Sequence, residues 1–184
     1  EIPLRLVGSE MCIRDRTWVE NVYRLFTDRN FAIIDKDGKK IGYARSVWAM
    51  ISLNTRKPAD LLALHGGSIV DYVCDEPCPI EKPSRIKVTS TEPASSLNAK
   101  YSDIDINGHV NSIRYIEHIL DLFPIELYKE SRIRRFEMAY VAESYYGDEL
   151  TFYKDYVGNG TYDIEVRKNG GEAVCRSKVI FVEK

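Results

Sequence analysis

The sequence has little of what marks a membrane protein, a disulfide-rich protein or a nucleic-acid-binding protein. Its longest apolar runs are far shorter than a membrane span. A formal net charge of −2 argues against a broad nucleic-acid-binding surface. The four cysteines form no framework of closely paired bridges, so we expect reduced thiols in a cytoplasmic protein. With 44% hydrophobic and 29% charged residues over 184 positions, the chain suits one ordinary globular domain or two small ones.

The cysteines do not predict a metal site either. Cys74 and Cys78 are spaced like half of such a site. No second pair of cysteine or histidine residues completes the ligand set. We therefore expect neither a metal nor an organic cofactor.

Residues 1–16 are expected to be a sequencing artefact. The stretch from Leu6 to Arg16 can be reverse-translated into a transposon-end adapter that is used in sequencing libraries. The alternative is a natural basic leader or targeting sequence, but the stretch lacks the apolar core of a signal peptide. The natural sequence is therefore expected to begin at Thr17, inside a longer protein.

The next part of the chain predicts a β-hairpin that no helix precedes. Residues 20–35 and 40–53 are rich in strand-forming side chains, and Asp35 to Gly38 between them is typical of a tight turn. We assign residues 17–62 to the C-terminal part of a first domain. Glycine and proline then interrupt every periodic pattern, so residues 63–94 are interpreted as an interdomain connector.

Residues 95–184 predict a complete second domain. A short strand at 96–102 is followed by a polar loop at 103–108. A helix then runs from Val110, with apolar residues on one face, to a stop at Pro124. One strand, one helix and then an antiparallel meander is the order of an α+β hotdog domain, in which the sheet wraps the helix. The meander is predicted at 132–144, 149–157, 162–167 and 173–182.

The polar loop before this helix is the segment most informative about chemistry. Together with its flanking residues, over 101–111, it places two carboxylates, two amides and an imidazole next to a helix N-terminus, where unpaired N–H groups suit a developing oxyanion. His109 is placed to orient or activate a water, Asn107 to hold that water or a carbonyl, and Asp105 to orient the imidazole or act as base. Composition alone favours a simpler alternative, an N-cap loop whose polar side chains satisfy backbone donors.

The spacing Asp-x-Asp-x-Asn-x-His-Val-Asn at residues 103–111 resembles the catalytic-domain motif of acyl-[acyl carrier protein] thioesterases. The resemblance continues through residues 114–116 and through 136–148, and upstream at 45–50 and 55–58. It covers nearly everything after residue 16. It implies tandem hotdog folds, of which the first is incomplete here and the second is complete with a central helix.

By position, this resemblance implies catalytic roles for Asp105, Asn107, His109 and Glu143. Ser144 stands where plant members typically carry a cysteine that was once proposed as nucleophile. The serine argues for a carboxylate and an imidazole that act on water. Asn111 is a candidate substrate-binding residue, with a structural role in the first helical turn as the alternative.

The implied reaction is hydrolysis of fatty acyl-[acyl carrier protein] thioesters to free fatty acids in fatty acid biosynthesis. The carrier protein is acidic, so Arg132, Arg134 and Arg135 are a candidate docking patch, with a solvated strand face as the alternative. Neither nucleic acid nor membrane is an expected partner, and a homodimer is left open.

Two other functions compete with this one. An acyl-CoA thioesterase would share the fold and much of the chemistry. A hotdog domain that binds acyl ligands without hydrolysing them would share only the fold. The presence of all four candidate catalytic residues favours hydrolysis, because a pure binding protein has no need of that combination.

Overall fold

The computed structural model describes residues 14–55 and 57–184. It divides into two compact units, with the division between Lys82 and Pro83, and each unit is built on one antiparallel sheet. No helix in the described ranges is long and apolar enough to cross a membrane. Residues 1–13, most of the expected artefact, lie outside the described residues, so that interpretation stays a prediction.

The first unit is a three-stranded sheet in the order β1-β2-β3. The prediction of a single strand over residues 20–35 is wrong, because the chain turns at Tyr23, whose amide donates to the Phe26 carbonyl at 2.8 Å. The predicted turn between β2 and β3 is confirmed, and Gly38 adopts the positive φ of 82° that glycine tolerates. The strands are β1 (Arg14–Val22), β2 (Phe26–Ile34) and β3 (Lys40–Ala49).

The predicted connector is ordered against the first sheet over its first half. It begins with the 3₁₀ helix η3 (Leu64–Tyr72). The Cys74 amide then donates to the Val19 carbonyl at 2.9 Å, and the Trp18 indole donates to the Glu76 carbonyl at 2.8 Å. Arg16 also forms an ion pair with Glu76 at 2.5 Å, so the start of β1 takes part in this packing.

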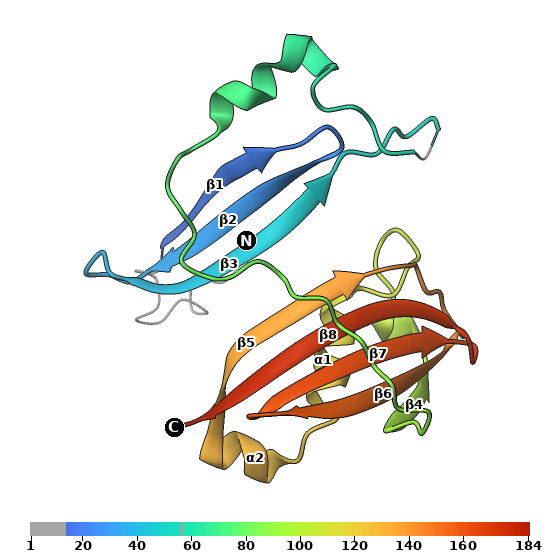
Figure 1. Cartoon of the computed structure of the whole chain (residues 1–184). Helices are drawn as coiled ribbons and strands as arrows, with labels where there is room; N and C mark the ends of the chain where they lie inside the picture. Colours follow the sequence, from blue (N-terminus) through green and yellow to red (C-terminus); the bar gives the residue numbers. More distant parts are fainter. Residues whose placement is uncertain (1–13, 56) are drawn as a thin grey trace, which may run out of the picture. The chain divides into compact units, whose positions relative to one another are not determined.

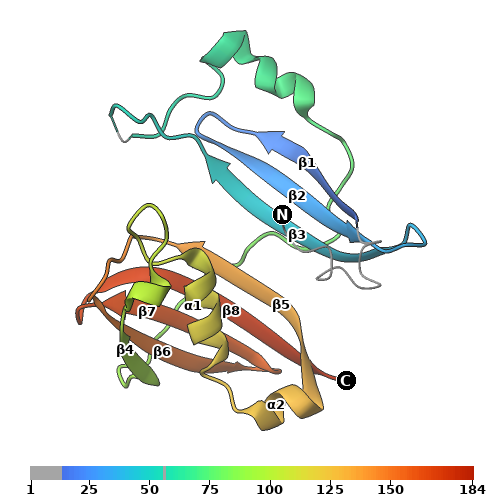
Figure 2. The same ribbon diagram turned by 180° about the vertical axis from the view of Figure 1, so that it is seen from behind.

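The second unit is a hotdog domain, as predicted. A five-stranded antiparallel sheet in the order β4-β6-β7-β8-β5 carries helix α1 on one face (Figures 1 and 2). Tyr115 and Ile119 of α1 are buried against Leu150, Phe152 and Ile164 of the sheet. The elements are β4 (Ser95–Asn98), η4 (Tyr101–Asp103), α1 (Ser112–Leu120), α2 (Ile125–Glu130), β5 (Ser131–Tyr140), β6 (Glu149–Gly158), β7 (Thr161–Lys168) and β8 (Glu172–Glu183).

Several details of this unit differ from the sequence prediction. The strands predicted at 96–102 and 132–144 end earlier, at Asn98 and Tyr140, so Glu143 lies in a loop. Strands β6, β7 and β8 form a meander, but β5 pairs with β8 at the far edge instead of with β6. Pro124 does not simply end one helix: it is the N-cap of the second helix α2, which the apolar pattern did not indicate. Proline suits this place because the first amides of a helix have no intrahelical acceptor.

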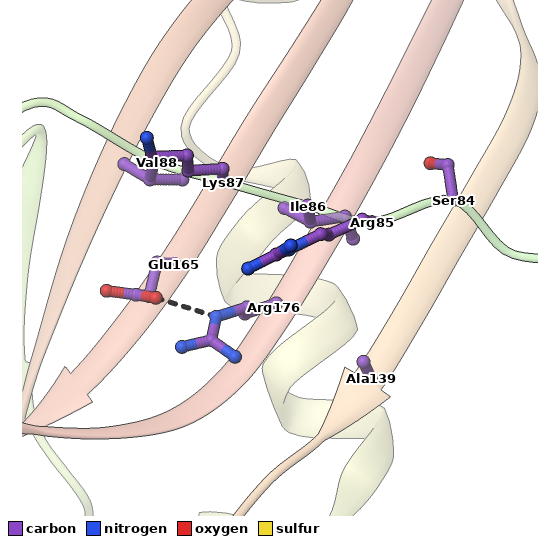
Figure 3. A pocket seen from close by; sticks show the side chains of 8 residues that line it. All are labelled: Ser84, Arg85, Ile86, Lys87, Val88, Ala139, Glu165 and Arg176. Atoms are coloured by element: carbon purple, nitrogen blue, oxygen red, sulfur yellow. Dashed lines mark hydrogen bonds and ion pairs between the residues drawn. The ribbon is translucent and has the colours of Figure 1, made fainter.

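An extended segment, residues 83–90, crosses the sheet on the face opposite to α1, and we call it the strap (Figure 3). Carboxylates of the strands hold it. The Ser84 amide donates to Glu137 of β5 at 2.8 Å, and the Thr89 amide donates to Asp155 of β6 at 2.6 Å. A depression of about 460 Å³ lies between strap and sheet, beside the Arg176–Glu165 ion pair (Figure 3).

Candidate active site

The polar loop before α1 is closed by the Asp105 carboxylate. Its Oδ1 accepts hydrogen bonds from the amides of Asn107 at 2.8 Å and His109 at 3.3 Å. The Asp105 amide donates to the His109 carbonyl at 2.8 Å, and the Gly108 amide donates to the Asp105 carbonyl at 3.0 Å. Gly108 has φ of 82°, which a residue with a Cβ rarely adopts. These local bonds set the direction in which His109 leaves the loop.

Asp105 is ionised in this arrangement. Partial desolvation raises the pKa of its carboxyl group, but the hydrogen bonds from the Asn107 and His109 amides and from the Asn107 side chain outweigh it. The pKa of Asp105 therefore lies below its ordinary value, and the acceptor that closes the loop carries its charge at neutral pH.

His109 and Glu143 meet at the start of α1, although α1, α2 and β5 lie between them in the sequence. His109 Nε2 lies 3.4 Å from Glu143 Oε2, with 25% of the histidine side chain and 57% of the glutamate side chain exposed. The Val110 amide donates to the Ser144 carbonyl at 2.8 Å, which joins the two loops next to the pair. The structure thus brings together the two predicted groups that can exchange a proton.

Two residues at this site were missed by the sequence analysis. The Tyr145 hydroxyl donates to Glu143 Oε2 at 3.1 Å. Lys168 Nζ donates to the Glu143 carbonyl at 2.8 Å. Tyr145 lies two residues beyond Glu143 and could have been noted from that spacing, whereas nothing in the sequence connects Lys168 of β7 with this loop.

Asn111 is the N-cap of α1. Its Oδ1 accepts from the Ile113 amide at 2.9 Å, and its own amide donates to the Asp103 carbonyl at 2.7 Å. The amides of Val110, Asn111 and Ile113 are thus already bonded within the protein. These amides are therefore not free to hold a carbonyl oxygen, whereas Asn107 is exposed.

A buried carboxylate, that of Asp103, contacts residues that lie before and after the polar loop in the chain. The Asp103 side chain is only 8% exposed, and it accepts from the Lys100 amide at 2.7 Å. His118 Nε2 of α1 lies 3.4 Å from Asp103 Oδ1. This contact links the loop to the helix that follows it.

Ser144 is buried, with 1% of the residue exposed. It lies beside the phenol of Tyr115. Burial raises the pKa of this phenol, and the Ser144 hydroxyl lowers it by less. A hydroxyl in this position is shielded from an external substrate.

The three arginines of β5 do not converge on the His109–Glu143 pair. Arg132 and Arg134 are exposed, and a bulge interrupts the strand between Ile133 and Arg135. Arg135 Nε donates to Glu137 Oε1 at 2.6 Å, so its charge is partly neutralised. The arginines lie at the start of β5, and at ~3.3 Å per residue roughly 20 Å of strand separates them from its other end, which leads to Glu143.

Comparison with known families matches both parts of the chain. The model of the acyl-ACP thioesterase C-terminal domain matches residues 86–183. The model of the acyl-ACP thioesterase N-terminal domain matches residues 5–63. The chain belongs to the acyl-ACP thioesterase family.

Individual members of this family agree in fold and differ in length. An acyl-ACP thioesterase structure from Bacteroides thetaiotaomicron is 79% identical, with a TM-score of 0.86, over 92% of this chain and 68% of that one. The 12:0-ACP thioesterase from Umbellularia californica shares the fold, with a TM-score of 0.76 at 19% identity, over 94% of this chain and 68% of that one. The palmitoyl-acyl carrier protein thioesterase of Arabidopsis thaliana is 27% identical over 134 residues, which are 69% of this chain and 32% of that protein. The chain thus spans about a third of the length of such curated relatives.

Proposed function

We propose that the full-length protein hydrolyses fatty acyl-[acyl carrier protein] thioesters to free fatty acid and carrier protein, in the cytoplasm, and that this chain carries the catalytic pair. The contact between His109 Nε2 and Glu143 Oε2 is the observation that carries the proposal. A carboxylate and an imidazole 3.4 Å apart, at a partly exposed helix start, are suited to take a proton from water.

In the proposed reaction the water oxygen bonds to the thioester carbonyl carbon, and its proton passes to the His109–Glu143 pair. The C–S bond then breaks, and the pair returns a proton to the leaving thiolate. Both steps conserve charge and need no cofactor. The buried hydroxyl of Ser144 plays no part as nucleophile.

The other predicted residues take separate roles. Asp105 shapes the loop, because its carboxylate is occupied by the amides of Asn107 and His109. The nearby amides of Val110, Asn111 and Ile113 are already bonded. The Asn107 side-chain amide has two N–H groups, so that one bonds Asp105 and the other donates to the carbonyl oxygen. Asn111 keeps α1 in place as its N-cap.

The acidic carrier protein is the proposed partner. Arg132 and Arg134 are the exposed cations of β5 that are assigned to docking. Arg135 contributes less, because it is paired with Glu137.

The test is an assay of the purified full-length protein on acyl carrier protein thioesters and on acyl-CoA, for wild type and Glu143→Gln. The proposal is supported if kcat/KM is higher for the carrier-protein substrate than for acyl-CoA, and if Glu143→Gln lowers turnover of that substrate by ~10²-fold or more. A higher kcat/KM for acyl-CoA identifies an acyl-CoA thioesterase instead. Acyl-ligand binding without release of a thiol identifies a non-catalytic acyl-binding protein.

A further inference from the structure

Tyr145 contacts both members of the proposed catalytic pair. Its hydroxyl donates to Glu143 Oε2 at 3.1 Å. Its ring meets the His109 ring edge to face, with centroids 5.3 Å apart and an interplanar angle of 84°. Lys168 Nζ lies 5.9 Å from the centroid of the same ring. One aromatic side chain is therefore in contact with the imidazole, the carboxylate and a neighbouring cation.

The Glu143 side chain is free to change rotamer unless other groups bind its carboxylate. Its side chain is 57% exposed, and a glutamate side chain in water samples many rotamers. His109 Nε2 and the Tyr145 hydroxyl both reach the same oxygen, Oε2. Oε1, the other oxygen of this largely exposed side chain, takes part in neither contact.

Lys168 holds the backbone of the same residue. Its Nζ donates to the Glu143 carbonyl at 2.8 Å and forms an ion pair with Glu172 at 3.1 Å, with only 18% of the lysine side chain exposed. Lys168 of β7 thus holds the main chain of Glu143 in place. The remaining freedom lies in the side-chain torsions, which the Tyr145 hydroxyl restricts.

We propose that Tyr145 is a positioning residue, which holds Glu143 Oε2 against His109 and leaves Oε1 facing the attacking water. The inference rests on the proposed hydrolysis at this pair. Loss of the hydroxyl lets the carboxylate rotate away from His109, so that fewer enzyme molecules have the productive geometry. The loss falls on kcat, because the hydroxyl binds Glu143 and not the substrate.

The test compares Tyr145→Phe with Tyr146→Phe in the full-length protein. The first change removes the hydroxyl and keeps the ring against His109. The second removes the same atom from the next residue, which is 72% exposed and lies outside the proposed catalytic machinery. A hydrogen bond to a charged group is lost only in Tyr145→Phe, so its kcat should fall roughly tenfold or more. Its KM should stay within about twofold, and Tyr146→Phe should match wild type.

The same substitution in a Glu143→Gln background separates positioning from general support of the fold. If Tyr145 acts through the carboxylate, Tyr145→Phe adds no further loss once that carboxylate is gone. The inference is overturned if Tyr145→Phe lowers kcat by the same factor in the wild-type and the Glu143→Gln backgrounds. It is also overturned if Tyr145→Phe alone keeps the wild-type kcat while Glu143→Gln alone lowers it. If Glu143→Gln itself has wild-type kcat, the proposed function has failed, and the inference fails with it.

Discussion

The Val110 amide donates to the Ser144 carbonyl at 2.8 Å, and this bond joins the loop that carries His109 to the loop that carries Glu143. Each bonded residue is the chain neighbour of one member of the pair. This bond therefore sets the distance between the two main chains, and substitution of either side chain should leave the two loops in place.

Removal of either member of the pair should lower turnover strongly. We expect His109→Ala and Glu143→Gln to reduce kcat by ~10²–10⁴-fold, the usual loss for a positioned acid–base group. Ser144→Ala should stay close to wild type, because the Ser144 hydroxyl is buried. Steady-state hydrolysis of an acyl carrier protein thioester is the measurement. An inactive but folded Ser144→Ala would show that serine is the nucleophile.

Charge reversal on β5 should affect the carrier-protein substrate selectively. Arg132→Glu with Arg134→Glu should raise KM for acyl carrier protein by roughly three- to tenfold and change KM for acyl-CoA little. Added salt should shrink the effect, because exposed charges are screened. Lys36→Glu, an exposed cation in the hairpin turn of the first unit, is the control. Equal losses on both substrates would argue against docking at these arginines.

The strap should loosen in acid. The backbone hydrogen bond from Thr89, helped by those from its hydroxyl and from Ser90, keeps the pKa of Asp155 below its ordinary value. Since the folded pKa is the lower one, this stabilisation is complete above the unfolded value of about 3.9 and is lost as pH falls through the folded value.

Asp155→Asn removes the charge at any pH. Exchange of the Thr89 and Ser90 amides with deuterium should accelerate about tenfold in this variant near neutral pH. Asp71→Asn, at an exposed aspartate of the first unit, should leave that exchange unchanged. Unchanged exchange in Asp155→Asn would mean that the strap is held by its other contacts alone.

The second unit should depend on the buried face of α1. Ile119→Ala removes a side chain with 0% exposure and should lower the free energy of unfolding by about 2–5 kcal/mol. Ile113→Ala on the same helix, 57% exposed, should cost far less. Chemical denaturation followed by circular dichroism compares the two. Similar losses for both variants would show that α1 is not packed as described.

The features that sequence reasoning predicted correctly depend on neighbours in the chain. The turn at Gly38 and the helix after Asn111 follow from residue types a few positions apart. The tight loop around Asp105 has the same origin, since its bonds span only two to four residues. Such interactions form in the same way wherever the segment lies. Motif spacing therefore indicated both the family and the hotdog fold.

The sequence by itself determined the residue types of the site, the loop that presents His109, and the order of α1 and the strands of the second unit. Only the tertiary structure decided that β5 pairs with β8, that Glu143 faces His109, and that Lys168 holds the Glu143 main chain. The physical reason is that these contacts depend on strand register. Register is chosen by burial of the whole sheet against α1, and no short segment of the chain contains that information.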